Sequence, residues 1–387
     1  MRNAIGLWCA SALVISACSG TTETTTAPAE SGVTTSLVGA TTTIVDGTTS
    51  TTTSSETADY LFELVETEAL GTGVEPWENG FVSPGAVVLH DGEWHMFYNA
   101  GPNRNSTGTP GVGHAVSQNG LDFFRQDPEP LFEASAPAFI EQGAGGVIPG
   151  SVLVEPDGTW VLYFSTTGFE GRFGSGVIGR ATAPAPDGPW AFDSEPLLSP
   201  GGVGEWDQLS IVNPHVLVVG DQYVMWYDAH QGDLDAKPTR QIGMATSDDG
   251  MEWTKYDDPS TTQPPLHVSD PVLGLGADDA WDSFRVNEPS VIEVDGGFVM
   301  FYGSDRRYEG QLERTWEWGY ATSADGIAWE RASVDPIWSS VGDVFTLMFN
   351  STAVQTPDGV WRIYVGAQNG ISLPTSVRVL EFAGDLP

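Results

Sequence analysis

The sequence predicts an all-β fold, a five-bladed β-propeller, from two observations. A pair of apolar strands joined by a tight turn, with the second strand ending in aromatic residues, occurs five times along the chain. The last aromatics of these second strands are 66, 63, 75 and 62 residues apart, at Tyr98, Phe164, Tyr227, Tyr302 and Tyr364. Repeats of about this length indicate a radial or linear array, and four antiparallel strands per repeat with tight hairpins are typical of propeller blades.

The first two strands of each repeat have the clearest pattern. The first strands are short, apolar and rich in β-branched residues, at 86–89, 151–154, 216–219, 290–293 and 352–355. Such runs are expected for strands that are covered on both faces. Asp-Gly or Gly-Asp follows each run, as in Asp91-Gly92 and Asp295-Gly296, and this pair favours a two-residue hairpin because both residues tolerate positive φ.

A third strand with small residues follows in the first four repeats. Its pattern, Gly-x-Ala, lies within 113–117, 179–182, 243–247 and 319–323, and a second turn and an aromatic residue come next. The fifth repeat lacks this pattern, so we expect residues 376–382 to supply its third strand. The early segment 61–65 has no blade of its own. We expect it to pair with the last blade and close the ring, which removes exposed strand edges.

The first 57 residues are expected to lie outside the propeller, which is assigned to residues 58–387. Residues 1–17 have a basic start followed by an apolar run, and Cys18 comes directly after Ala17 at the end of this run. This run resembles the signal peptide of bacterial lipoproteins, which implies lipidation at Cys18 and a place in the cell envelope or on the extracellular surface. Residues 18–57 are expected to be a disordered tether, because 16 of residues 21–57 are Thr and such a segment buries little apolar area.

Charge and cysteine content narrow the function further. The formal net charge is −37, with 15 basic and 52 acidic residues, so nucleic acid is not an expected partner. Both cysteines, Cys9 and Cys18, precede the predicted propeller, so no disulfide is expected there. No apolar run of 18 residues follows the signal, so the membrane is expected as a partner only through the lipid anchor. A monomer without metal or cofactor is expected.

Candidate site residues lie just before the first strand of each repeat, where the innermost strands of a propeller enter a shared axial cavity. These segments are 82–85, 148–150, 212–215, 286–289 and 349–351. Proline is tolerated there because a strand's first residue need not donate to the ladder. The polar residues beside it are harder to explain by packing. They include Asn213, His215, Asn287 and Glu288.

The third and fourth repeats hold the most acidic candidates. Asp207 and Asp282 each follow a Trp and lie six residues before Asn213 and Glu288, respectively. Asp228 and Asp305 follow the second strands of the same repeats. We expect these carboxylates to converge with Arg285 on one rim of the cavity. A plainer interpretation of Asp207 and Asp282 is that they cap the turn before the first strand.

The repeated pattern, above all Gly-x-Ala-Thr-Ser-x-Asp-Gly-x-x-Trp at 243–253 and 319–329, resembles five-bladed glycoside hydrolases of the family 43 and family 32 group, with mannoside phosphorylases as further relatives. The resemblance covers about residues 75–370 and implies a carbohydrate site at the axial funnel. In those families an Asp-Pro commonly opens the first two blades. This chain has Ser83-Pro84 and Pro149-Gly150 instead, which puts the usual catalytic carboxylates in doubt.

Two functions therefore remain open, beside a purely structural role in the cell envelope. In the first, the protein cleaves glycosidic bonds of an extracellular glycan, which requires one protonated and one ionised carboxyl. Glu288 is then the acid or base, with Asp207 or Asp282 as partner, and Arg285 tunes the pair. Substrate is held by Arg285 and five further residues, namely Asn213, His215, Asp228, Asp305 and Asn287. In the second, the same funnel binds a glycan or a protein without catalysis.

Overall fold

The computed structural model describes residues 60–387 except 104, 139–145, 167–175, 232–238, 307–314, 333–334, 341–344 and 370–373, together with strand positions 44–45 and 48–49. The chain divides into two compact units, Met1–Asp59 and Tyr60–Pro387. In the first unit only β1 (Ile44–Val45) and β2 (Thr48–Thr49) are described, and they pair antiparallel. The predicted signal peptide, Cys18 and the rest of the predicted tether lie outside the described residues.

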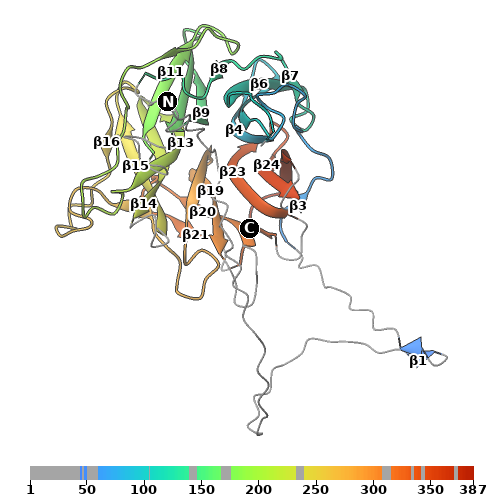
Figure 1. Cartoon of the computed structure of the whole chain (residues 1–387). Coiled ribbons are helices and arrows are strands. Elements are labelled where there is room, and N and C mark those ends of the chain that lie inside the picture. The colour runs from blue at the N-terminus through green and yellow to red at the C-terminus, as the bar shows by residue number, and fades with distance from the viewer. Residues whose placement is uncertain are drawn as a thin grey trace, which may run out of the picture. The chain divides into compact units, whose positions relative to one another are not determined.

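The second unit is built from strands, and its described residues contain no helix. The strands form five antiparallel blades, numbered here in chain order (Figure 1). Blade 1 comprises β4 (Phe81–His90), β5 (Glu93–Gly101), β6 (Gly111–Ser117) and β7 (Phe124–Arg125). Blade 2 comprises β9 (Val147–Val154), β10 (Trp160–Thr166), β11 (Ile178–Ala183) and β12 (Ala191–Phe192). Blade 3 comprises β13 (Ser210–Val219), β14 (Gln222–Gln231), β15 (Thr239–Ser247) and β16 (Thr254–Lys255).

Blade 4 comprises β18 (Asn287–Val294), β19 (Gly297–Arg306), β20 (Thr315–Ser323) and β21 (Glu330–Arg331). Blade 5 comprises β23 (Phe345–Gln355), β24 (Val360–Asn369) and β25 (Thr375–Ala383). Three short strands pair with the third strands of blades 1, 3 and 4, namely β8 (Phe132–Glu133), β17 (Pro271–Leu273) and β22 (Trp338–Ser339). No described helix is long and apolar enough to cross a membrane.

The N-terminal segment of the second unit closes the ring on the last blade. Strand β3 (Glu63–Leu64) pairs with β25, with Leu64 opposite Leu380. A single parallel pair, Thr375 with Phe81, also links blade 5 to blade 1, and Figure 1 shows these two blades side by side. The predicted pairing of residues 61–65 with the last blade is confirmed, and β25 contains the predicted late strand 376–382.

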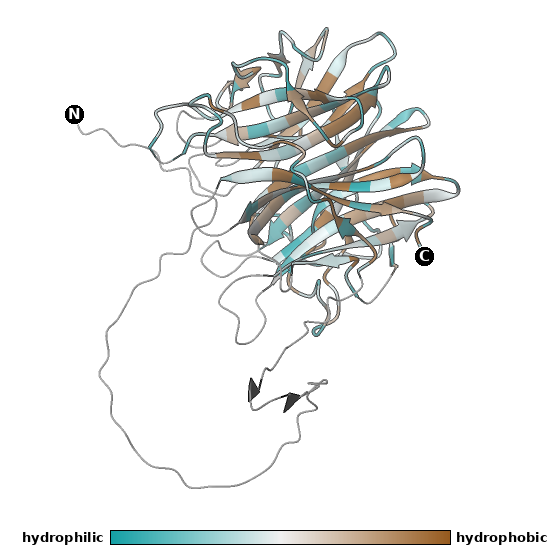
Figure 2. Cartoon of the chain, turned by 90° about the vertical axis from the view of Figure 1, so that its right-hand side faces the viewer, coloured by the Kyte–Doolittle hydropathy of each residue, from teal (hydrophilic) through white to brown (hydrophobic). Residues whose placement is uncertain are grey.

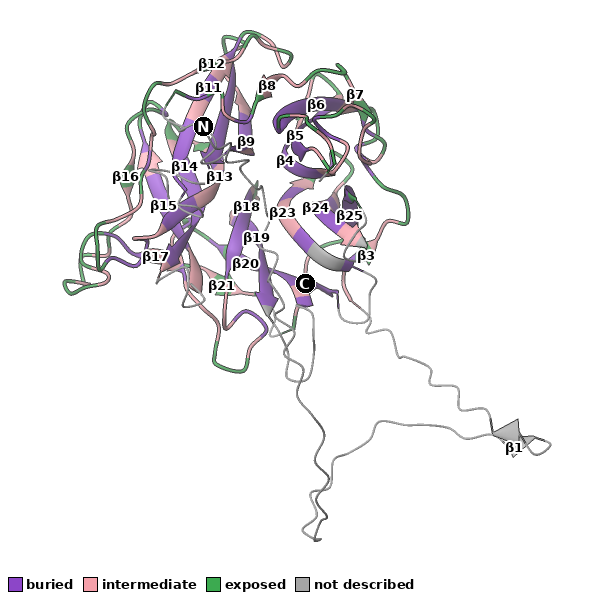
Figure 3. Ribbon diagram, viewed as in Figure 1, coloured by how far each residue is buried: buried purple, intermediate pink, exposed green. Residues whose placement is uncertain are grey.

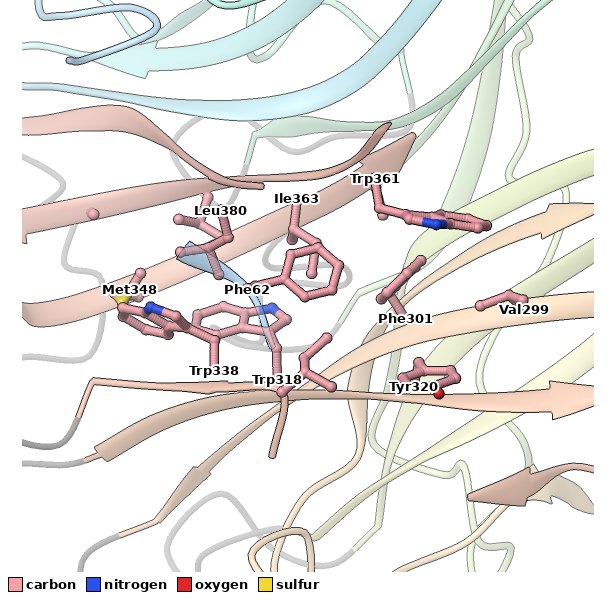
Figure 4. Close-up of a cluster of buried hydrophobic side chains, with 14 of the residues drawn as sticks. Phe62, Val299, Phe301, Trp318, Tyr320, Trp338, Met348, Trp361, Ile363 and Leu380 are labelled. Atoms are coloured by element: carbon pink, nitrogen blue, oxygen red, sulfur yellow. The ribbon is translucent and has the colours of Figure 1, made fainter. Parts of the chain in front are cut away.

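The hydrophobic core is divided among the contacts between neighbouring blades. Five clusters of buried side chains each join one blade to the next. Figure 2 shows the apolar bands along the strands, and Figure 3 shows that strands are mostly buried whereas connecting turns are mostly exposed. The cluster between blades 4 and 5, drawn in Figure 4, packs Trp318 and Phe301 against Ile363 and Trp361, with Phe62 from the closing segment among them.

The turn after the third strand is a second point of contact between blades. In blade 4, Ser323 Oγ accepts a hydrogen bond from Gly326 N at 2.9 Å, and Asp325 Oδ1 accepts from Ile327 N and Ala328 N at 2.9 Å. Blades 1 and 3 repeat these bonds. The carbonyl of Gly326 accepts from Trp226 Nε1 of blade 3 at 2.9 Å. The repeated turn therefore fixes its own hairpin and the neighbouring blade.

Candidate functional site

All five innermost strands carry a β-bulge near their beginning. The register shifts at Gly85, Gly150, Asn213-Pro214, Glu288-Pro289 and Asn350 in blades 1 to 5. Bulges redirect side chains and are frequent beside active sites. Residues at and beside the bulges line one axial cavity, to which all five blades contribute. The structure therefore brings together the five segments that the sequence singled out.

The axial cavity is narrow at the level of the bulges. Its volume is about 10 Å³, which is room for about one water molecule. Glycine permits this close approach, since a Cβ on Gly85 would lie 2.5 Å from the Pro149 Cβ and one on Gly150 would lie 2.5 Å from the Pro214 carbonyl oxygen. A sugar ring does not fit in this volume, so a glycan site on the axis must lie outside this cavity.

Side chains from one blade hold the bulge of the next. Ser165 Oγ accepts from Asn213 N at 3.3 Å, and Asp228 Oδ1 accepts from Glu288 N at 3.3 Å. Glu288 continues the series, because its Oε1 accepts from Asn350 N at 3.0 Å and its Oε2 accepts from Ser351 N at 2.9 Å. These bonds join blades 2 to 5 around the axis and fix the orientation of the Glu288 carboxyl.

The same series extends from blade 5 to blade 1. Asn350 Nδ2 donates to Ser83 Oγ at 3.0 Å and lies 3.4 Å from Asn99 Oδ1. Ser83 Oγ also donates to Asn99 Oδ1. Blades 1 and 2 thus contribute hydroxyl, amide and backbone groups to the axis. The carboxylates come from blades 3 and 4.

Glu288 adopts a backbone conformation that is unusual for its residue type. Its φ is +56°, and the corresponding bulge residues Asn213 and Asn350 have φ of +53° and +51°. Asparagine visits this left-handed region readily, whereas a side chain such as Glu costs about 1 to 2 kcal/mol there. Glu288 is only 5% exposed. A strained residue with a buried carboxyl is a signature of functional sites.

Asp228 is the carboxylate nearest to Glu288 in this network. It is fully buried, and its Oδ1 accepts from Asn213 Nδ2 at 2.7 Å. Its Oδ2 lies 3.5 Å from His230 Nε2 and 3.6 Å from the Arg240 guanidinium. Burial raises the pKa of Glu288, and the negative charge of Asp228 raises it further, against the bond from Ser351. The pair therefore favours a proton on Glu288.

Two arginines lie side by side at the border of blades 3 and 4. Arg240 and Arg285 form an isolated parallel bridge, in which Val286 N donates to Arg240 O at 3.0 Å. Arg285 donates to both carboxylate oxygens of Asp305, at 2.9 and 3.2 Å. Burial, and then the charge of Arg240, lowers the pKa of Arg285 to about 10. Asp305 thus orients Arg285.

Several buried polar atoms near these groups have no hydrogen-bond partner among the described residues. They include the Nε atoms of Arg240 and Arg285, both ring nitrogens of His230, Oδ2 of Asp228 and Oδ1 of Asn287. Unpaired buried polar atoms are uncommon, and a polar ligand is one way to satisfy them. Burial, followed by the charge of Arg240, lowers the pKa of His230 to about 4, so this imidazole is neutral near pH 7.

His215 lies apart from these groups, in the axial cavity. Burial lowers its pKa to about 4, opposed by a hydrogen bond with the backbone of Val291. This imidazole is therefore also neutral near pH 7. In the described part of the chain, no three His, Cys, Asp or Glu residues are placed to share a metal ion.

The structure gives Asp207 and Asp282 other partners than Glu288. Asp282 Oδ2 accepts from Arg331 Nε at 2.6 Å and from the Tyr302 hydroxyl at 3.1 Å. Asp207 is fully buried and pairs with Lys255. Arg331 and Lys255 lie on β21 and β16, the outermost strands of blades 4 and 3. Each aspartate therefore links the segment before its innermost strand to the far edge of the sheet.

Blade 1 contains the same arrangement with a glutamate. Glu78 Oε2 accepts from Arg125 Nε on the outermost strand β7 at 2.7 Å and from the Tyr98 hydroxyl at 3.0 Å. A Trp precedes the acid in all three blades, and Trp77-Glu78 was the signal in the sequence for this third copy. The repetition favours a structural role for Asp207 and Asp282. Within the described residues, no contact supports the predicted partnership of either with Glu288.

The structure thus brings together Asn213, Asp228, Arg285, Glu288 and Asp305, with Asn287 beside them in the chain. Arg240 carries no signal in the sequence, because it lies before the Gly-x-Ala pattern at 243 that marks the third strand. The extension of β15 back to Thr239 brings Arg240 next to Arg285. The groups of blades 3 and 4 therefore form a site of three carboxyls, Asp228, Glu288 and Asp305, and two guanidinium groups, Arg240 and Arg285.

Comparison of sequences gives distant relatives, and no protein-family model matches the chain. Uncharacterized protein MT1551 of Mycobacterium tuberculosis (strain CDC 1551 / Oshkosh) is 29% identical over 180 residues, which are 45% of this chain and 54% of that protein. The match spans about half the length of that relative. Beta-1,2-mannobiose phosphorylase of Thermoanaerobacter sp. (strain X514) is 24% identical over 120 residues, 29% of this chain and 35% of that protein.

Solved structures resemble the chain over most of its length. A glycosyl hydrolase from Bacteroides ovatus has a TM-score of 0.60 at 17% identity and covers 86% of this chain and 93% of its own. A structure from work on the GH130 family of mannoside phosphorylases, which contains glycoside hydrolases that target beta-1,2 mannosidic linkages in Candida mannan, has a TM-score of 0.60 at 18% identity, covering 87% and 98%. Zg3597, a family 117 glycoside hydrolase of Zobellia galactanivorans, has a TM-score of 0.57 at 16% identity, covering 83% and 90%. The chain therefore has the fold of the five-bladed propeller glycoside hydrolases and phosphorylases, as its repeats predicted.

Proposed function

We propose that this protein cleaves glycosidic bonds of a glycan at the propeller axis, with Glu288 as the proton-transferring group. One observation carries the proposal: a buried carboxyl, held in a strained conformation at the axis, whose pKa is raised by burial and by Asp228. Proton transfer to a leaving oxygen requires a carboxyl that keeps its proton near neutral pH. The propeller glycosidase fold supports the choice of substrate class.

Asp228 is the partner of Glu288 in this proposal, in place of Asp207 or Asp282. The two carboxyl groups belong to one hydrogen-bond network, and two neighbouring carboxyls do not both ionise easily. Asp228 is fully buried, so it acts through Glu288 as a positioning residue. Asp207 and Asp282 are engaged by the cations Lys255 and Arg331 on the outermost strands instead, which directs their charge away from the axis.

The arginine pair bears on whether the reaction is hydrolysis or phosphorolysis. Hydrolysis needs an activated water molecule, whereas phosphorolysis uses a phosphate ion that Arg-lined sites bind well. Arg240 and Arg285 each keep a buried Nε without a partner among the described residues. Their charges are partly balanced by Asp228 and Asp305, which moderates the attraction for phosphate. Turnover measured with and without phosphate separates the two.

The test is a turnover screen of the purified full chain. Aryl-glycosides, β-1,2-mannobiose and neutral polysaccharides are incubated with the protein, with and without inorganic phosphate, and products are separated by chromatography. Release of free sugar without phosphate supports hydrolysis, and appearance of a sugar 1-phosphate supports phosphorolysis. No product from any substrate over days contradicts the proposal of catalysis.

A non-catalytic glycan- or protein-binding module is the second candidate function. One observation favours it, since Ser83 and Gly150 stand where related enzymes commonly carry Asp and the first two blades provide no carboxylate to the axial cavity among the described residues. Binding of a glycan to the same protein preparation, without turnover, would select this function. Loss of that binding in Arg285→Met would place it at the axial site.

We also propose that a lipid on Cys18 holds the domain at the cell envelope, separated from the membrane by the Thr-rich segment. The support is the run of small residues before Cys18. Expression of the full chain and its Cys18→Ala variant in a bacterium, followed by detergent phase partitioning, tests the anchor. The wild type should enter the detergent phase and the variant should not; equal partitioning contradicts the anchor.

A further inference from the structure

The outer edge of blade 1 carries a pocket that the axial site does not use. It has a volume of about 450 Å³ and lies between the segment 68–71, the end of β6, the following turn and β7. Ligand-binding pockets are typically about 300 to 1,000 Å³. The axial cavity is formed by the innermost strands, whereas β7 is the outermost strand of its blade. The two places are therefore at opposite ends of the same sheet.

An exposed aromatic ring, Phe124, lies at this pocket. It is 68% exposed, whereas its neighbour Phe123 is 7% exposed and belongs to the core between blades 5 and 1. An aromatic ring left in water forgoes the favourable free energy that its burial would contribute to folding. A large aromatic side chain in solvent beside a pocket therefore calls for an explanation other than folding.

The repeats within the chain supply an internal comparison. Register places Phe124 of blade 1 at the same position as Ala191, Thr254 and Glu330 of blades 2, 3 and 4. Its cross-strand partner is Val116, where the other three blades have Thr182, Thr246 and Thr322. Both members of this pair are apolar in blade 1 alone. The blade fold therefore does not require Phe124, and both residues line the pocket.

Hydrogen-bond acceptors line the same pocket as the Phe124 ring. Three carboxylates line the pocket, and each has one oxygen engaged: Glu68 with Ser376 Oγ at 3.0 Å, Glu93 with Gln118 Nε2 at 2.8 Å and Asp122 with Asn119 Nδ2 at 2.9 Å. Within the described residues their second oxygens have no protein partner. The guanidinium group of Arg125 already forms an ion pair with Glu78. The free groups are thus acceptors beside an aromatic surface.

We infer that this pocket is a second carbohydrate-binding site, which takes a neutral sugar unit of a glycan. A sugar ring offers an apolar face that stacks on an aromatic ring, and its hydroxyl groups donate to the free carboxylate oxygens, as charged acceptors favour. The carboxylates exclude anionic glycans by repulsion. The site would hold a polymer on the outer edge of blade 1 independently of what occurs at the axis.

The test is affinity electrophoresis of the full chain in gels that contain mannan, arabinan or xylan, with polygalacturonate as the anionic control. Glu288→Gln is run beside the wild type, so that cleavage at the axis does not deplete the polymer. Phe124→Thr places in blade 1 the residue that blade 3 carries. Val218→Thr, at a 44% exposed valine of β13, is the matched control. Thermal midpoints confirm that each variant is folded.

At least one neutral polysaccharide should retard the wild type, Glu288→Gln and Val218→Thr equally, and Phe124→Thr should weaken this binding at least about tenfold, as expected for loss of a stacking ring. Polygalacturonate should not retard any of them. Equal retardation of Phe124→Thr and wild type overturns the inference, as does the absence of retardation by all three neutral polymers. A change of oligomeric state in Phe124→Thr, measured by light scattering, would assign the ring to self-association instead. Because the readout is binding, failure of catalysis at the axis leaves this test intact.

Discussion

Asp282 and Arg331 form an ion pair in blade 4, with Asp282 Oδ2 and Arg331 Nε 2.6 Å apart. The pair joins the segment that precedes the innermost strand of this blade to its outermost strand. Asp282 is 1% exposed and Arg331 30%. Equivalent pairs in blades 1 and 3, Glu78 with Arg125 and Asp207 with Lys255, show that the arrangement belongs to the blade. In each of these three blades the ion pair connects the segment before the innermost strand to the outermost strand.

The first prediction concerns this pair. Asp282→Asn should lower the free energy of unfolding by about 2 to 4 kcal/mol, because it leaves a mostly buried guanidinium without its counter-charge. Urea denaturation followed by tryptophan fluorescence measures the loss. Glu330→Gln is the matched control, since Glu330 is an exposed acid on the same strand, and it should change stability by less than about 0.5 kcal/mol. Equal stability of Asp282→Asn and wild type would contradict the structural role.

A second prediction tests whether the glycine at position 319 is needed to leave room for the Trp that precedes Asp282. A Cβ on Gly319 would lie 2.4 Å from Cζ2 of Trp281, the residue before Asp282. Gly319→Ala should therefore destabilise the protein by about 1 to 3 kcal/mol through overpacking. A Cβ on Gly202 would meet nothing within 4 Å, so Gly202→Ala should be nearly neutral. Thermal unfolding of both variants decides, and the same midpoint for the two would count against the packing described here.

A third prediction concerns closure of the ring by the N-terminal segment. Phe62 is 1% exposed and packs against Phe301, with ring centroids 5.8 Å apart, and against Phe382 at 5.6 Å. Phe62→Ala should cost about 3 to 5 kcal/mol. Val74→Ala, at a residue 91% exposed, is the control and should have almost no effect. Chemical denaturation that gives similar stabilities for both variants would show that closure does not depend on this contact.

The fourth prediction is a dependence of stability on pH at the contact of blades 1 and 2. His95 Nδ1 and His114 Nε2 are 3.0 Å apart and both rings are buried. Burial lowers the pKa of His95, and burial together with His95 lowers the pKa of His114 to about 4, although Glu93, Asp91 and Asp187 raise these values. The unfolded chain, with an imidazole pKa near about 6.5, takes up protons first, so acid favours unfolding.

Stability should therefore fall as the pH decreases from about 6.5 toward 4, by about 2 kcal/mol between pH 7 and 5 for His114 alone. Denaturation series at pH 7, 6 and 5 measure the slope. His114→Asn lowers stability at pH 7 because it disturbs packing, but its loss between pH 7 and 5 should be smaller than that of the wild type. Parallel slopes for the two proteins would exclude the histidine pair as the source.

The sequence was sufficient for the blades because each repeat carries its own local signals. Asp-Gly turns, apolar first strands and the Gly-x-Ala third strands depend on neighbours a few residues away, and the structure has these strands. The first strands begin earlier than the pattern indicated, β4 at Phe81 against the predicted 86. The bulge at Gly85 lets pairing continue past Pro84, which a proline in an apolar run otherwise argues against.

The candidate site was harder to predict, because its contacts join residues far apart in the chain. Spacing suggested Asp207 and Asp282 as partners of Glu288, yet their cations lie 48 and 49 residues downstream. Only the folded sheet brings the segment before the innermost strand close to the outermost strand. Arg240 and Arg285 likewise meet through a bridge between two blades. The segments at the axis could be predicted from their position before the first strands, whereas their pairing could not.

The most direct test of the proposed function compares turnover by Glu288→Gln and Asp282→Asn at a temperature where both are folded, on the substrate that the screen identifies. Loss of a general acid or base costs about 10²- to 10⁴-fold in rate, so Glu288→Gln should lose at least about 100-fold in kcat. Asp282→Asn should keep kcat within a few-fold of the wild type despite its lower stability. Wild-type turnover by Glu288→Gln, or loss of turnover only in Asp282→Asn, would contradict the assignment of the proton-transferring carboxyl to the axis of blade 4.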